Sequence, residues 1–251
     1  MNVKTIDRAK SKLMDLLRDK NLWDAEISVL ARALTPEEAI GTPGRRDFPI
    51  IIGKERMLEA TILDSKGQAF TDSRKEFIGT LRQVFDLPLI NNGNRAIFVA
   101  TMNAVLRYIG MSGSTIHCRN DEPEMCAVEI ADFIDKNFHP ERVGLIGLNP
   151  AIAEALSKKF GGDNLMITDL YYKNIGSKKF DTGILDGNSQ NEYLIKNSDF
   201  VLITGTTIVN DTFDEIMSAV EKYDRQYILY GVTASGICSL FDIPRICPYS
   251  K

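Results

Sequence analysis

The sequence has few of the residues on which catalytic and metal sites most often depend. Only two histidines, four cysteines and one tryptophan occur among 251 residues. The cysteines are scattered, which excludes the disulfide framework of a small secreted domain and favours a reducing cytoplasm. With two histidines and no nucleophile motif, a Ser-His-Asp hydrolase is also excluded.

Excess positive charge and long apolar runs are absent as well. The formal net charge of −4 argues against non-specific binding of nucleic acid, which needs a basic face. No apolar run approaches the roughly 18 residues of a spanning helix, and the first residues lack the apolar core of a signal peptide. We therefore expect a cytoplasmic protein with no nucleic-acid or membrane partner. Whether the protein forms a homodimer is left open.

The standard phosphate-binding motifs are missing too. There is no Gly-Lys-Ser/Thr P-loop, and Gly144 and Gly147 have the wrong spacing for the Gly-x-Gly-x-x-Gly of a dinucleotide site. Asp169 nevertheless stands about twenty residues after this turn, where a ribose-binding acid is expected. An aspartate at a strand end is also a common turn residue, so a nucleotide-type ligand is not excluded.

The two parts of the chain have different patterns. Before about residue 112, helices and strands are mixed, which predicts an α+β unit over residues 1–112. Its expected helices are 5–18, 77–85 and 95–108, and its expected strands are 24–34, 48–52 and 57–63, the last followed by a turn at 64–67.

After about residue 112, buried strands alternate with helices, which predicts a mostly parallel sheet covered on both faces. Residues 113–251 are therefore expected to form a Rossmann-like α/β domain. A helix is expected to end near residue 138. The expected strands are 142–147, 165–168, 199–204 and 226–230; the expected helices are 150–160, 212–222 and 234–241, with a loop or edge strand at 173–187.

Small and polar residues follow the expected parallel strands. In open parallel sheets, ligands bind beyond the carboxyl ends of the strands, and free amides at helix N-termini favour anionic groups. We therefore expect one cleft for a small polar or anionic ligand, lined by Gly147, Asn149, Asp169, Thr204, Gly205, Thr206, Asn210 and Thr233.

Asn103 interrupts a helix that is apolar almost all round. Such a helix is buried on most sides, and a buried amide needs partners for both its nitrogen and its oxygen. Asn103 is therefore expected either to face the ligand or to hold a neighbouring loop.

The stretch 114–126 concentrates side chains that can bind metals, at the join between the two parts. It contains His117 and Cys118, followed by Glu122, Glu124 and Cys126. Thiolate, imidazole and carboxylate are the usual zinc ligands, although His-Cys-x7-Cys matches no standard finger spacing. The alternative is that the acidic residues and Pro123 start a helix whose Cys126 is packed in the core. The candidate metal ligands are His117, Cys118, Glu122 and Glu124.

Four segments together resemble one known family. They are Thr-Ile-His-Cys-Arg-Asn-Asp-Glu-Pro-Glu-Met-Cys, Val-Gly-Leu-Ile-Gly-Leu-Asn-Pro-Ala-Ile, Val-Leu-Ile-Thr-Gly-Thr-Thr-Ile-Val-Asn-Asp-Thr and Tyr-Gly-Val-Thr. In this order they resemble the putative heavy-metal chelation domain family of uncharacterised prokaryotic proteins. The resemblance implies an N-terminal part similar to the capping domain of enolases, a Rossmann-like second domain and a site between them. It does not imply enolase chemistry, because the barrel and its magnesium carboxylates are absent. The family's features would fall on Asn103, His117, Cys118, Glu122, Pro123, Glu124, Gly147, Asn149, Thr204, Gly205, Thr206 and Asn210.

Three functions follow as hypotheses. The first is binding or handling of a transition metal ion or a metal–organic small ligand at the interdomain cleft. The second is a Rossmann-type enzyme acting on a small metabolite or nucleotide-like substrate, with His117 as acid or base and Cys118 as nucleophile. The third is a structural protein without a ligand. Catalysis is left open.

Overall fold

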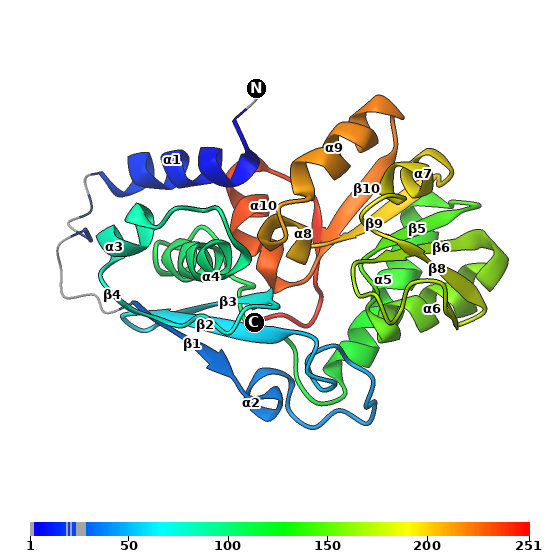
Figure 1. The fold of residues 1–251 in the computed structure, drawn as a ribbon, viewed down its shortest axis with the longest axis horizontal. Coiled ribbons are helices and arrows are strands. Elements are labelled where there is room, and N and C mark those ends of the chain that lie inside the picture. Colours follow the sequence, from blue (N-terminus) through cyan, green and yellow to red (C-terminus); the bar gives the residue numbers. More distant parts are fainter. Residues whose placement is uncertain (1–2, 19, 21, 24–28) are drawn as a thin grey trace.

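The computed structural model describes residues 3–18, 20, 22–23 and 29–251. Two sheets lie side by side, with helix α4 close to the first sheet and a layer of helices around the second (Figure 1). The chain is therefore an α/β protein in which an antiparallel unit precedes a mostly parallel one, as the sequence predicts.

The N-terminal unit is built on a four-stranded antiparallel sheet of order β3-β2-β1-β4. Helix α4 packs against β3 and β2. The strands are β1 (Val29–Leu34), β2 (Arg56–Ile62), β3 (Ser65–Thr71) and β4 (Phe77–Gly79). The helices are α1 (Thr5–Leu17), α2 (Pro36–Ile40), α3 (Leu81–Asp86) and α4 (Asn92–Tyr108).

Three expectations for this unit were wrong. Residues 48–52 form turns instead of a strand, although Phe48 and Ile50 are buried. Residues 64–67 do not form a long turn, because β3 already begins at Ser65. The expected helix 77–85 opens as strand β4, which pairs with β1 before helix α3 begins. Of the strand expected at 24–34, residues 24–28 lie outside the described part of the chain.

The second sheet has seven strands in the order β11-β10-β9-β5-β6-β8-β7. All neighbours pair in parallel except β7, which is antiparallel to β8. If β7 is left out and the other six strands are numbered 1 to 6 along the chain, their order across the sheet is 3-2-1-4-5-6. This is the strand order of the doubly wound dinucleotide-binding fold. The strands are β5 (Val143–Ile146), β6 (Leu165–Asp169), β7 (Lys178–Lys179), β8 (Thr182–Asp186), β9 (Phe200–Thr204), β10 (Gln226–Tyr230) and β11 (Arg245–Ile246).

Helices cover both faces of this sheet. Strand β9 shows the two layers, because Phe200 and Leu202 join the core that contains α5 and α6, whereas Val201 and Ile203 join the core on the opposite face. The helices are α5 (Glu122–Phe138), α6 (Pro150–Phe160), α7 (Asn191–Lys196), α8 (Thr206–Val209), α9 (Phe213–Lys222) and α10 (Ser235–Phe241), with short 3₁₀ turns at Gly162–Asn164 and Val232–Ala234.

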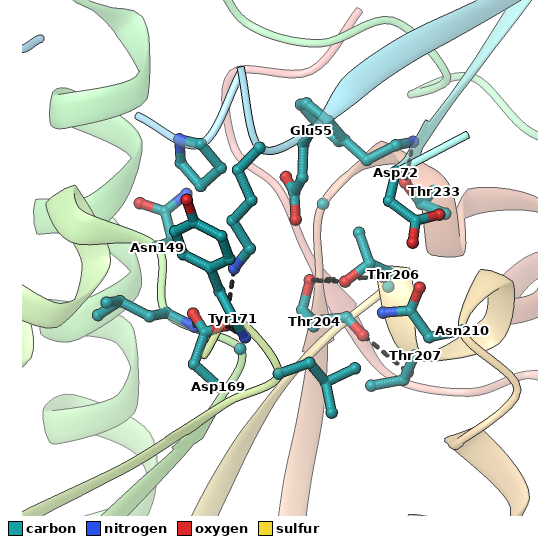
Figure 2. A pocket seen from close by; sticks show the side chains of 18 of the residues that line it. Glu55, Asp72, Asn149, Asp169, Tyr171, Thr204, Thr206, Thr207, Asn210 and Thr233 are labelled. Atoms are coloured by element: carbon teal, nitrogen blue, oxygen red, sulfur yellow. Dashed lines mark hydrogen bonds and ion pairs between the residues drawn. The ribbon is translucent and has the colours of Figure 1, made fainter. Parts of the chain in front are cut away.

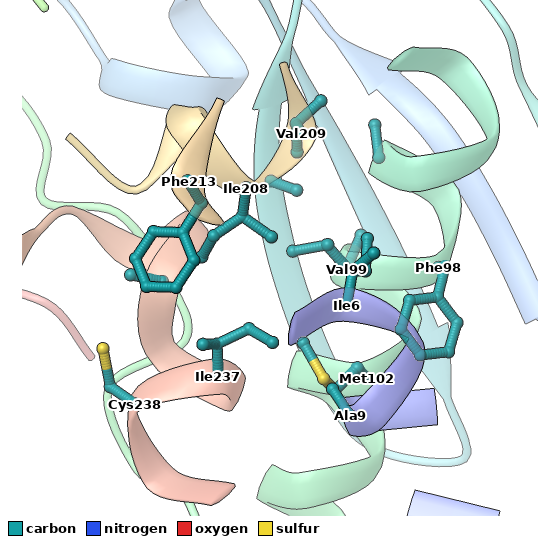
Figure 3. Packing of buried hydrophobic residues seen from close by; sticks show 14 of the residues in the cluster. Ile6, Ala9, Phe98, Val99, Met102, Ile208, Val209, Phe213, Ile237 and Cys238 are labelled. Atoms are coloured by element: carbon teal, nitrogen blue, oxygen red, sulfur yellow. The ribbon is translucent and has the colours of Figure 1, made fainter. Parts of the chain in front are cut away.

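One hydrophobic core is shared by the two units. Side chains of α1 and α4 lie close to those of α8, α9 and α10 (Figure 3). Met102 of α4 and Ile237 of α10 are both fully buried in this cluster. The expected boundary between residues 112 and 113 lies in the connector between α4 and α5, but the core extends across it. The division into two domains therefore stays a prediction. No described helix has the length and apolar character needed to cross a membrane.

Candidate functional site

A pocket of about 540 Å³ lies between the two sheets. One wall is made of the residues that follow β5, β6, β8, β9 and β10, at the carboxyl ends of the parallel strands. The opposite wall comes from residues 48–55 and 70–72 of the N-terminal unit. Between β5 and β9 the direction of strand succession reverses, so the pocket is at the switch point where this class of sheet binds ligands.

The structure brings most of the sequence-predicted residues to this pocket. Those that line it are Gly147, Asn149, Asp169, Thr204, Gly205, Thr206, Asn210, Thr233 and His117. Asn103 is not among them. Its side chain is fully buried and makes three hydrogen bonds to backbone: its Nδ2 donates to the carbonyls of Gln68 and Val232, and its Oδ1 accepts from the amide of Gly236. Asn103 therefore joins α4 to β3, to the 3₁₀ turn before α10 and to α10 itself.

The strand ends are packed closely at the switch point. Gly147 has a φ of +87°, and a Cβ there would be only 2.5 Å from Thr204 Cγ2. The buried Tyr230 hydroxyl donates to the Gly147 carbonyl at 2.9 Å, and burial raises the pKa of this phenol, so it stays a neutral donor. Glycine is required at position 147 because both its backbone angle and this contact exclude a side chain.

The N-terminus of α6 has no free amide for an anion. Pro150 has no N–H, and the Asn149 side chain accepts from the amides of Ala151 and Ile152 at 3.1 and 3.3 Å. The next amide, Ala153, donates to the Asn149 carbonyl. The position that holds the pyrophosphate in dinucleotide-binding proteins is therefore already satisfied by the chain itself.

Asp169 is likewise fully engaged. Its Oδ1 accepts from Lys54 Nζ at 2.7 Å and from the Tyr171 amide at 2.6 Å. Its Oδ2 accepts from the Leu148 amide at 3.3 Å and from Asn174 Nδ2 at 3.2 Å. A carboxylate has about four lone-pair positions, so none is left for ribose hydroxyls. Asp169 holds loops together instead of offering a ribose contact.

Lys54 crosses the pocket to reach Asp169. Its ammonium group also lies over the Tyr171 ring, 5.2 Å from the centroid. The side chains of both ion-pair partners are largely buried, so their charges neutralise each other within the site.

Glu55 is the pocket carboxyl without a partner among the described residues. Its side chain points into the pocket (Figure 2). Burial raises the pKa of this carboxyl to about 7, Asp169 and Asp72 add to the rise, and Lys54 opposes it. Glu55 therefore titrates near neutral pH and is an acid–base candidate.

The remaining polar groups come from β3 and the β9–α8 loop. Asp72 accepts from Asn92 Nδ2 at 2.9 Å through one carboxylate oxygen. The hydroxyls of Thr204 and Thr206 are 3.1 Å apart, and Asn210 points toward the pocket from the same loop (Figure 2). The Thr233 hydroxyl accepts one hydrogen bond, from the Phe70 amide at 3.0 Å.

His117 lines the pocket as a neutral imidazole. Its Nδ1 lies 2.6 Å from the Cys118 carbonyl, and because a carbonyl only accepts, Nδ1 carries the proton. Burial lowers the pKa of the ring, so Nε2 keeps a free lone pair at neutral pH. The His117 amide donates to Gln68 Oε1, and the ring packs edge-on against Phe70.

Of the other candidate metal ligands, Cys118 lies next to His117, with its Sγ 3.7 Å from Nδ1, the nitrogen that is already bonded to the Cys118 carbonyl. Cys118 is buried in the core, as is Cys126. Glu122 accepts from the Arg119 amide and pairs with Lys251, and Glu124 pairs with Arg45. Within the described ranges, no three His, Cys, Asp or Glu side chains are arranged to hold a metal ion. The loop therefore supplies a helix start and core contacts, which is the alternative that the sequence left open.

Sequence reasoning missed Lys54, Glu55 and Asp72. All three reach the pocket from the N-terminal unit, and the strand-end rule applies only to the parallel sheet. The sequence contains one local signal, because Gly53 before the charged pair Lys54-Glu55 is typical of a turn. In the structure, Gly53 has a φ of +76°. Charged residues on a turn are common, however, and only the packing of the two units places these side chains in the site.

A comparison with protein families matches residues 130–244 to DUF364, described as "Putative heavy-metal chelation". The matched residues make up most of the parallel-sheet unit, which is therefore similar to this family. Two solved DUF364 structures, both described as proteins of unknown function, are similar in fold. The one from Pyrococcus horikoshii has 15% identity and a TM-score of 0.55, over 92% of this chain and 80% of that one. The one from Desulfitobacterium hafniense DCB-2 has 15% identity and a TM-score of 0.52, over 94% and 83%. No curated protein matches the sequence.

Proposed function

We propose that this protein binds a small polar organic molecule in the pocket between the two sheets, and that a metal ion enters only as part of such a molecule. The observation that carries the proposal is the unpartnered Glu55 carboxyl in a pocket at the switch point. Glu55 is partly exposed, and a carboxyl that points into a pocket without a protein partner is available to a polar ligand.

The size and lining of the pocket favour an organic molecule over a bare ion. A volume of about 540 Å³ falls within the range of small-molecule sites, and the lining mixes apolar side chains such as Ile50 and Leu148 with polar ones. A tightly bound zinc ion needs three or four converging protein ligands, which the described residues do not supply.

The heavy metal in the family's name does not fit the residues that the sequence suggested for it. Cys118 is buried in the core, and both Glu122 and Glu124 have cationic partners. His117 offers one nitrogen to the pocket, because its other nitrogen bonds a carbonyl. One imidazole can complete the coordination of a metal that already has organic ligands, and this supports a metal–organic ligand.

One observation favours catalysis as a second function. A carboxyl with a pKa near 7 inside a pocket can both accept and donate a proton at neutral pH, and the neutral His117 ring lines the same pocket. The substrate would be a small metabolite. The dinucleotide mode is not supported, because the groups at Asp169 and Asn149 are already satisfied.

The test is to analyse what the protein carries after purification without an affinity tag. Denatured wild-type protein should release an organic molecule in near-stoichiometric amount, with any metal lost together with it. Thr206→Trp fills the pocket and should abolish this release. Ser11→Trp, on the exposed face of α1, is the matched control and should not. Stoichiometric metal that stays bound after the organic molecule is dialysed away would contradict the proposal.

A further inference from the structure

The described residues that line the pocket carry no uncompensated positive charge. Its lysine, Lys54, is paired with Asp169, and the neutral His117 ring adds no charge. The amides at the start of α6 bond Asn149, so they offer nothing to an anion. Of the two ligand classes that the sequence suggested, polar and anionic, these groups favour the polar one.

Acceptors remain on one side of the pocket, which we name the acidic side and define as Glu55, Asp72, Thr206 and Asn210. Glu55 and Asp72 point into the pocket from the N-terminal unit, and Thr206 and Asn210 face them from the β9–α8 loop (Figure 2). Glu55 is partly exposed and Asp72 is exposed, and both line the pocket. No described side chain or amide donates to that carboxyl, and one oxygen of Asp72 is also free of a partner.

We propose that the acidic side binds the protonated nitrogen group of the ligand, an ammonium or a guanidinium. The inference rests on the proposed function and names the chemical class of its ligand. An ammonium group needs about three acceptors, which two carboxylates and a hydroxyl or amide oxygen supply. A bare metal ion would need more ligands than the described residues bring together here. Charged hydrogen bonds are also stronger than those between neutral groups.

Binding is linked to a proton at Glu55. This carboxyl faces Lys54, Asp169, Asp72 and Tyr230, and together with burial they place its titration near neutral pH. A cationic ligand needs the ionised carboxylate, so its affinity rises as the pH rises through about 7. Below this pH, binding displaces one proton. His117 lines the same pocket, and a Glu55 variant separates its contribution from that of the carboxyl.

The experiment measures three matched probes by titration calorimetry: 2-phenylethylamine, 3-phenylpropionate and 3-phenyl-1-propanol. They share an aromatic ring and differ in the charge of the end group. Wild-type protein at pH 8 should bind the amine most tightly, and the carboxylate should bind at least about tenfold more weakly, the effect of one charged hydrogen bond. The amine should bind more weakly at pH 6 than at pH 8.

Glu55→Gln should weaken amine binding about tenfold or more at pH 8 and remove most of its pH dependence. The matched control is Glu141→Gln, which is exposed and precedes β5 at the opposite end of the sheet, and it should leave both properties unchanged. Equal or tighter binding of the carboxylate, an amine affinity that is unaffected by Glu55→Gln, or no amine binding to wild type would overturn the inference. The proposed function is tested separately, because an anionic molecule released from the untagged protein would refute only the cationic class.

Discussion

At the scale of single residues, the positions of the pocket residues were predictable where one rule applied. Parallel strands end at the same edge of a sheet, so Gly147, Asp169 and Thr204 could be placed together from the order of the strands alone. What each side chain does there could not be predicted. Whether Asp169 is free or fully bonded depends on Lys54, which comes from a turn more than a hundred residues earlier.

Glu55 gives a prediction for stability against pH. Its pKa rises from 4.5 to about 7 on folding, so the folded protein binds this proton more tightly than the unfolded chain does. The free energy of unfolding therefore falls by roughly 2–3 kcal/mol as the pH rises from about 4.5 to about 7. Glu55→Gln should remove this loss and be more stable than wild type at pH 8, with a smaller difference near pH 5. Urea unfolding of both proteins at pH 5 and pH 8 measures this difference in the free energy of unfolding. A variant less stable at pH 8 would contradict the burial of this carboxyl.

Asp169→Asn should lower the free energy of unfolding by about 3 kcal/mol, because it leaves the ammonium of Lys54 without its charged partner inside the pocket. Asp181→Asn is the control, since the Asp181 side chain is 87% exposed, and it should change stability by no more than about 0.5 kcal/mol. Urea denaturation of both variants is the measurement. Equal effects would show that the four bonds to Asp169 are not a structural requirement.

At the scale of elements, periodicity predicted the long helices and the strands of the parallel sheet. It failed for β3, whose residues Ser65, Gly67 and Gln68 are unlike those of a usual strand. The structure explains the glycine, because a Cβ at Gly67 would lie 2.2 Å from the Ala104 amide of α4. It failed at 48–52 because buried Phe48 and Ile50 belong to turns that fill the space between the two units. In both cases, contacts between elements override the local pattern.

The link between α4 and its neighbours depends on Asn103. Asn103→Ala should destabilise the protein by roughly 3 kcal/mol or more, because two carbonyls and one amide lose a buried partner and a cavity is left. The control is Asn137→Ala, an exposed position on α5 whose amide bonds only the Phe133 carbonyl. Chemical denaturation compares the two. A small effect at Asn103 would mean that water replaces its bonds, and that the residue is more accessible than the structure shows.

At the scale of the whole molecule, the sequence predicted two units with a site between them but not the core that they share. Ile6 and Ala9 of α1 pack in the same cluster as Ile237 of α10, so the first helix of the chain contacts the last (Figure 3). No periodic pattern shows which helix faces of different units will meet. The shared core fixes the two walls of the pocket relative to each other, which a site built from both units requires.

This shared core predicts a single cooperative unfolding transition. Trp23, the sole tryptophan, lies in the N-terminal unit with its ring 4.9 Å from that of Phe85, so its fluorescence reports on this unit. Far-ultraviolet circular dichroism reports mainly on the helices of the whole chain. The two signals should give the same midpoint in urea. Separate midpoints would show that the units unfold independently and that the division near residue 112 is a true domain boundary.

The central claim is that the pocket at the switch point holds a small organic ligand. It is tested most directly by a crystal structure of the protein isolated without an affinity tag and without chelators. We predict electron density for an organic molecule in the pocket, with a nitrogen group within hydrogen-bonding distance of Glu55 and Asp72. A metal ion bound by His117 and Cys118, with only water in the pocket, would contradict the account.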